Sequence, residues 1–125
     1  MERLKGKTAM VVGAGSIGPG WGNGKATAVT FAREGAQVFC VDRNAAAAKE
    51  TVDIITGEGG KATAFTADVS RGQDVTAMFS AVERAHGRLD VLVNNAGLNV
   101  RSDFRHLSDA DWVKIREVNL DGVVR

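Results

Sequence analysis

The segment that decides the fold is Val11–Ala28, which reads VVGAGSIGPGWGNGKATA and contains six of the 15 glycines and the only proline. Its first glycines, Gly13, Gly15 and Gly18, match the pattern G-x-G-x-x-G. Between a strand and a helix, this pattern marks a dinucleotide-binding turn, because the N–H groups of the turn and of the helix N-terminus attract a diphosphate. The apolar run before Gly13 predicts the strand, and the amphipathic run from Lys25 predicts the helix.

The helix cannot follow this pattern directly. Each glycine inside a helix costs roughly 1 kcal/mol relative to alanine, and the stretch from Gly18 to Gly24 is mostly glycine with Pro19. We therefore expect the helix to begin between Gly22 and Lys25, so that Gly18 is not the glycine that packs the helix against the strand. A mobile glycine-rich loop that holds no ligand is the alternative.

Short apolar segments alternate with helical patterns along the chain. Near-continuous apolar runs are typical of parallel strands covered on both faces, and such strands are joined by right-handed crossovers. The sequence therefore predicts a Rossmann-type α/β fold, with three layers and a parallel sheet of strand order 3-2-1-4, truncated before the later strands of that fold. The expected strands are 8–12, 36–42, 61–68 and 89–95, with the third nearer the sheet edge and the fourth the most apolar.

Three helix starts are predicted from capping patterns. Asn44 can cap a helix that ends at Gly57. Ser70 and Gln73 have the spacing of a capping box, and a similar pair, Ser108 and Asp111, precedes the last apolar pattern.

Composition and charge favour one globular domain spanning residues 1–125, with a net charge of +1. The small charge argues against binding to nucleic acid or to a membrane surface. The charged start of the chain lacks the apolar core of a secretion signal, so we expect a cytoplasmic protein. Cys40 is the only cysteine, which excludes an internal disulfide and a cysteine-based metal cluster, and its apolar surroundings predict a buried side chain.

Asp42 ends the second expected strand. A carboxylate there can accept hydrogen bonds from the adenosine ribose hydroxyls and would repel the 2′-phosphate of NADP, so the sequence favours NAD. Arg43 weakens this preference, because a guanidinium can accommodate a phosphate. The separation from Gly13 exceeds the usual distance of about 20 residues, as expected for an enlarged loop. A turn-forming aspartate before a helix is the alternative.

From about Leu4 to its last residue, the chain resembles the short-chain dehydrogenases/reductases in their NNAG form. LDVLVNNAG carries the family's NNAG at residues 94–97, and ADVS carries Asp68 and Val69. VNLDGV places Asn119 on the family's catalytic asparagine. The resemblance implies that Asp68 binds the adenine amino group, that the Val69 backbone binds the ring, and that Asn119 holds a water in a proton relay. It also implies that the cofactor groove is lined by Asn94, Asn95, Ala96 and Gly97. Strand-end hydrogen bonds for the asparagines, and a kinked helix at Asn119, are the alternatives.

The resemblance also implies an alignment for the glycine loop. Ile17–Trp21 becomes an insertion, in which Trp21 is a flap over the diphosphate. Trp21 also occupies a position where NADP-preferring members often carry a basic residue, which favours NAD. Val12 departs from the family's threonine. The turn residues implied to bind cofactor are Gly13, Ser16, Gly22, Asn23 and Gly24.

The family's acid/base residues are absent from this sequence. The chain has no tyrosine, and therefore no Tyr-x-x-x-Lys, and it stops at Arg125 before the expected serine. We expect the cofactor-binding half of an NAD(P)-dependent oxidoreductase that acts, when complete, on a small alcohol or ketone and forms homo-oligomers only at full length. The alternative is a non-catalytic nucleotide-binding or interaction module.

Overall fold

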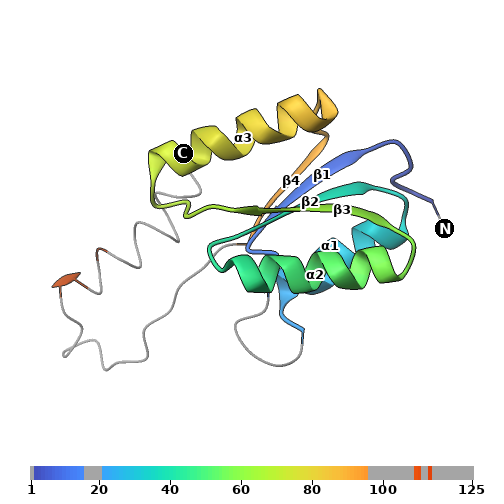
Figure 1. Cartoon of the computed structure of the whole chain (residues 1–125), viewed down its shortest axis with the longest axis horizontal. Helices are drawn as coiled ribbons and strands as arrows, with labels where there is room; N and C mark the ends of the chain where they lie inside the picture. Colours follow the sequence, from blue (N-terminus) through green and yellow to red (C-terminus); the bar gives the residue numbers. More distant parts are fainter. Residues whose placement is uncertain (1, 16–20, 96–108, 111–112, 114–125) are drawn as a thin grey trace.

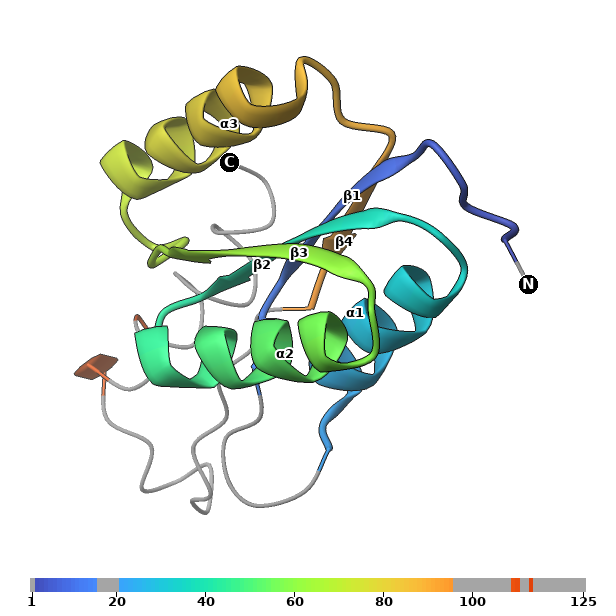
Figure 2. The same cartoon turned by 45° about the vertical axis from the view of Figure 1, so that its right-hand side comes forward.

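Parallel strands form the sheet in the predicted order, β3-β2-β1-β4, in a computed structural model that describes residues 2–15, 21–95, 109–110 and 113 (Figure 1). Helices α1 and α2 cover one face, and α3 covers the other (Figure 2). This arrangement confirms the three-layer Rossmann-type prediction. The elements are β1 (Thr8–Val12), α1 (Asn23–Arg33), β2 (Gln37–Asp42), α2 (Ala45–Gly57), β3 (Lys61–Thr66), α3 (Gly72–His86) and β4 (Val91–Asn94).

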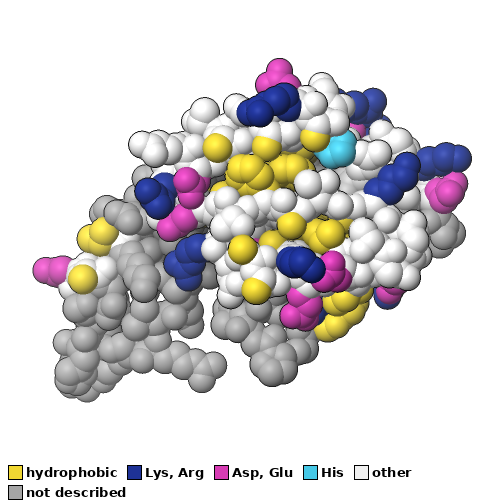
Figure 3. All heavy atoms as spheres, viewed as in Figure 1, with side chains coloured by type: hydrophobic (Ala, Val, Ile, Leu, Met, Phe, Trp, Pro, Cys, Tyr) yellow, Lys and Arg dark blue, Asp and Glu magenta, His cyan; other side chains and the backbone are white. Residues whose placement is uncertain are grey.

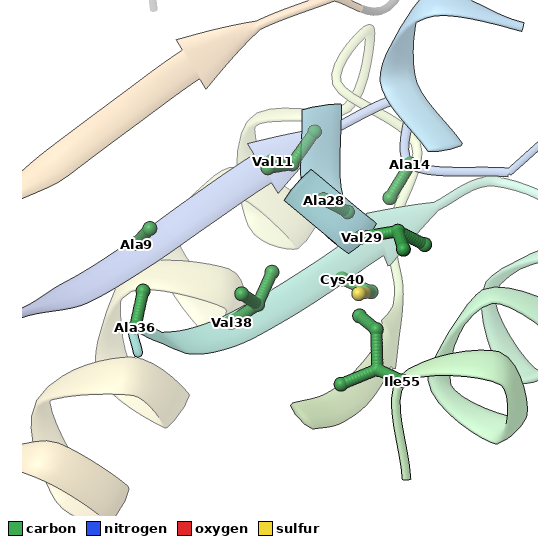
Figure 4. Packing of buried hydrophobic residues seen from close by; sticks show 9 residues of the cluster. All are labelled: Ala9, Val11, Ala14, Ala28, Val29, Ala36, Val38, Cys40 and Ile55. Atoms are coloured by element: carbon green, nitrogen blue, oxygen red, sulfur yellow. The ribbon is translucent and has the colours of Figure 1, made fainter. Parts of the chain in front are cut away.

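The two central strands supply a core on each face of the sheet. Successive side chains of a strand point to opposite faces, so an unbroken apolar strand feeds both cores. On the face of α1 and α2, Val11 and Cys40 pack with Val29 and Ile55 (Figure 4). On the face of α3, the core contains Met10, Val12, Phe39, Val41, Val75, Met78 and Val82. Cys40 is fully buried as predicted, and burial raises the pKa of its thiol to about 12.

The outer strands are less buried than the central ones. The edge position predicted for β3 is confirmed, and its Phe65 stacks on Phe39 with ring centroids 5.7 Å apart. Hydrophobic side chains gather between α3 and the sheet on this side (Figure 3). The fourth strand, predicted as the most apolar, is shorter than expected and only partly buried, with Leu92 42% exposed. The reason is its place in the sheet, because among the described residues β4 pairs only with β1.

The predicted caps have different outcomes. Asn44 caps α2, where its Oδ1 accepts a hydrogen bond from the Ala47 N–H at 3.2 Å. The capping box at Ser70 is wrong: the N-cap of α3 is Arg71, without a side-chain cap. Asp68 competes for Ser70, because its Oδ1 accepts hydrogen bonds from both the hydroxyl and the N–H of Ser70. Ser108 and Asp111 lie outside the described residues.

A carboxylate joins the start of β1 to the start of β4. Asp90 Oδ2 accepts a hydrogen bond from the Thr8 N–H at 2.8 Å, and the Asp90 N–H donates to the Thr8 carbonyl at 2.9 Å. The Arg88 guanidinium donates to both oxygens of the same carboxylate. The hydrogen bond from Arg88 and the one from Thr8 hold the pKa of Asp90 below its usual value.

This contact predicts a pH dependence for Asp90→Asn. Because the folded pKa of Asp90 lies below the unfolded value of about 3.9, its carboxylate stabilises the fold above that pH. The stabilisation is lost as the pH falls from about 4 toward the folded pKa. We expect Asp90→Asn to melt below wild type at neutral pH and the gap to close in acid, as measured by circular dichroism. Asp53→Asn, in an exposed pair with Lys49, is the control. A gap for Asp90→Asn that is equal at every pH would contradict this account.

Candidate functional site

The carboxyl ends of β1, β2 and β4 meet at one edge of the sheet, where Val12 is level with both Val41 and Asn94. The chain leaves β1 through Gly13, whose φ of 84° lies in the left-handed region that favours glycine. The N–H groups of Gly13 and Ala14 both donate to the Val41 carbonyl, at 2.8 and 3.0 Å. The turn after β1 is therefore fixed to the end of β2.

Gly24 brings the start of α1 against this turn. A Cβ at position 24 would lie 1.8 Å from the Gly13 carbonyl oxygen and 2.7 Å from Asn95 Nδ2. Asn95 Nδ2 itself donates to that carbonyl at 3.3 Å. Only glycine allows this approach, so the prediction that Gly18 is not the packing glycine agrees with the contact at Gly24.

The helix begins where the glycine spacing predicted. Its N-cap is Gly22, in an extended conformation, and Asn23 is its first residue. Since Gly22 has no side chain, the first turn of α1 is not capped by its own N-cap residue. Because α1 begins beside the Gly13 carbonyl, the positive end of its dipole lies at the same edge of the sheet as Gly13 and Asp42.

Asp42 is held in place from two sides. Its Oδ2 accepts a hydrogen bond from the Gly15 N–H, and its Oδ1 accepts one from the Asn44 N–H, both at 2.9 Å. A carboxylate oxygen has two lone pairs, so each oxygen of Asp42 can accept a further hydrogen bond from a ligand hydroxyl.

Gly15 is a site residue whose importance the sequence interpretation missed. A Cβ there would lie 2.4 Å from the Cβ of Ala47 and 3.0 Å from Asp42 Oδ2. The signal was Gly15 in the G-x-G-x-x-G match, a position that is not among the turn residues implied to bind cofactor. Next to Gly15, the carbonyl of Ala14 accepts a hydrogen bond at 2.9 Å from the buried hydroxyl of Thr51. Helix α2 thus holds the glycine turn at two successive residues.

Asp68 lies after β3, beside the end of β2. The Ala67 N–H donates to the Asp42 carbonyl at 3.1 Å, which connects the two segments. Partial burial opposes ionisation of Asp68, but the hydrogen bonds from Ser70 and the charges of Arg43 and Arg71 outweigh it and lower its pKa. Asp68 is therefore an anionic acceptor at neutral pH. Its neighbour Val69 is buried.

The predicted site residues fall into two groups. The structure brings together most of them at the carboxyl edge: Gly13, Gly22, Asn23, Gly24, Asp42, Arg43, Asp68, Val69, Asn94 and Asn95. Ser16, Ala96, Gly97 and Asn119 lie outside the described residues. Trp21 is 51% exposed and its ring lies over the Lys25 ammonium, 5.5 Å from the centroid. Whether Trp21 covers a diphosphate stays a prediction.

A hollow of about 940 Å³ lies at the opposite edge of the sheet. Lys7, Gly35 and Lys61 line it at the amino ends of the strands. The carboxyl ends of α1 and α2 also lie there. No group of three potential metal ligands occurs in the described part of the chain. No helix among those residues is long and apolar enough to cross a membrane.

Comparisons with known proteins agree with this geometry. A family model described as short chain dehydrogenase matches residues 7–125. A short chain dehydrogenase/reductase of Aspergillus oryzae is 42% identical over 122 residues, which are 96% of this chain and 45% of that protein. The crystal structure of a short-chain dehydrogenase/reductase from Burkholderia xenovorans superimposes with a TM-score of 0.94 at 41% identity, covering 99% of this chain and 49% of the other.

A metagenomic short-chain oxidoreductase in complex with NADP matches with a TM-score of 0.86 at 32% identity, covering 95% of this chain and 52% of the other. The chain therefore spans about half the length of the relatives it matches.

Gly24→Ala tests the contact between α1 and the turn after β1. Because the added Cβ would overlap the Gly13 carbonyl, α1 must shift, and we expect a loss of roughly 1–3 kcal/mol in the free energy of unfolding. Denaturant titration measures it. Gly57→Ala is the matched control, since a Cβ at this last residue of α2 meets nothing within 4 Å. Equal effects of the two substitutions would refute the close contact at Gly24.

Proposed function

The chain belongs to the short chain dehydrogenase family, and we propose that residues 1–125 form the dinucleotide-binding domain of an oxidoreductase that acts on a small alcohol or ketone. The observation that carries this proposal is the cradle at the carboxyl edge of the sheet, where Gly15 and Gly24 leave no room for a Cβ. Asp42 lies in the same cradle, with both carboxylate oxygens oriented by backbone N–H groups.

The residues present fit a nicotinamide dinucleotide. The diphosphate would lie at the N-terminus of α1, next to Gly13 and Gly22, where the helix dipole stabilises negative charge. Asp42 would accept hydrogen bonds from the ribose hydroxyls, and Asp68 would accept one from the adenine amino group. When bound, the nicotinamide supplies or accepts a hydride.

NAD is proposed as the preferred form of the cofactor. The Asp42 carboxylate is fixed by Gly15 and Asn44, so it cannot easily turn away from a 2′-phosphate, and the repulsion disfavours NADP. Arg43 lies close enough to Asp68 to lower the pKa of that carboxyl, so part of its charge is already balanced. A relative of the same family was solved in complex with NADP, so the preference for NAD over NADP has to be measured on this chain.

The remaining roles concern the complete enzyme. We propose that Asn119 holds a water in the proton relay, and that Ala96, Gly97 and Ser16 contact the cofactor. The acid/base chemistry that the family assigns to a tyrosine has no counterpart within these 125 residues, which contain none. We also propose a cytoplasmic location, and homo-oligomers for the full-length form.

Calorimetric titration with NADH and NADPH tests this proposal. We expect NADH to bind the chain at least tenfold more tightly than NADPH, which corresponds to about 1.4 kcal/mol. Asp42→Asn removes the charge, so it should weaken NADH binding and bring the two affinities together. Asp53→Asn, on α2 but paired with Lys49, is the control and should bind like wild type. A chain that unfolds cooperatively but binds neither dinucleotide would contradict the proposed function, and tighter binding of NADPH would contradict the preference.

A further inference from the structure

Lys25 is a buried cation in an unfavourable place. It lies in the first turn of α1, with only 3% of its side chain exposed. The N-terminus of a helix carries partial positive charge, so an ammonium there is disfavoured by the helix dipole as well as by burial. Contacts with other groups must compensate for both effects.

Two groups provide this compensation, and they come from different parts of the chain. The Glu50 carboxylate of α2 accepts a hydrogen bond from Lys25 Nζ at 2.5 Å, in an ion pair. The Trp21 ring supplies its negative face, 5.5 Å from the ammonium. Glu50 is itself 66% exposed, so the buried end of this cluster is Lys25.

The cluster connects the glycine loop to α2 at a second point. At the start of the loop, Ala14 is hydrogen bonded to Thr51 and Gly15 packs on Ala47, both on α2. At its end, Trp21 directly precedes the N-cap Gly22, and Lys25 joins it to Glu50 on the same helix. Both ends of the loop are therefore anchored to one stretch of α2, from Ala47 to Thr51.

We propose that Lys25 is a positioning residue for dinucleotide binding: its contacts with Glu50 and Trp21 hold the end of the glycine loop so that the first turn of α1 meets the diphosphate in a fixed geometry. This inference rests on the proposed function. Lys25 itself does not touch the cofactor in this account. Without the cluster, Trp21 and Gly22 sample other conformations, and ordering them on binding lowers the affinity.

The test compares Lys25→Met, Glu50→Gln and Lys25→Arg by titration with NADH. Lys25→Met and Glu50→Gln should each weaken binding about tenfold, whereas Lys25→Arg, which retains the charge, should stay within about threefold of wild type. Lys49→Met, which breaks only the exposed pair with Asp53 on α2, is the matched control and should bind like wild type.

A spectroscopic measurement separates positioning from a merely structural role. In a Trp112→Phe background Trp21 is the only tryptophan, and energy transfer from it to bound NADH reports where its ring lies. At saturating NADH, Lys25→Met and Glu50→Gln should show altered energy transfer, whereas Lys25→Arg should show the wild-type value.

Each outcome has one meaning. If wild type binds no NADH, the proposed function fails. If wild type binds and both Lys25→Met and Glu50→Gln bind equally well with unchanged transfer, the positioning role of Lys25 is overturned. Should Lys25→Met not fold, Glu50→Gln decides alone, because the amide oxygen that replaces the carboxylate can still accept a hydrogen bond from the buried Lys25 ammonium.

Discussion

The contact between Gly24 and the Gly13 carbonyl is the constraint on which the rest of the site depends. Because a Cβ at residue 24 would lie 1.8 Å from that oxygen, α1 can start directly beside the end of β1 only if this residue is glycine. The contact places the N-terminus of α1 at the edge where β1, β2 and β4 end. The Asn95 side chain, which follows β4, donates a hydrogen bond to the same carbonyl.

The site is built from groups that stabilise the fold and would also bind a ligand. Asp42 orders the glycine turn through Gly15 and the start of α2 through Asn44, and its remaining lone pairs can accept hydrogen bonds from the proposed ribose. Helix α2 anchors the glycine loop through Thr51 at one end and through Glu50 and Lys25 at the other. A dinucleotide would therefore meet residues 13–15 and 21–25 already held in place by these contacts, which reduces the entropy lost on binding.

Local patterns predicted the strand order, the start of α1 and the Asn44 cap, because these depend on periodicity, glycine cost and short-range capping. Features set by tertiary contacts were not predictable in this way. The partial burial of β4 follows from its place in the sheet. The capping box at Ser70 failed for a local reason, because Asp68, two residues earlier, accepts hydrogen bonds from the Ser70 hydroxyl and N–H. The importance of Gly15 and the burial of Lys25 depend on α2, which approaches them only in the folded chain.

Hydrogen exchange of the chain with and without NADH tests most directly where the dinucleotide binds. We predict slower exchange at the carboxyl edge, in residues 13–15, 22–25, 42–44 and 68–69. We predict no change at the opposite edge, in residues 5–7, 35–37 and 58–61, which line the hollow at the amino ends of the strands. Protection confined to that hollow, or no protection around Gly13 and Gly24 at saturating NADH, would contradict this prediction.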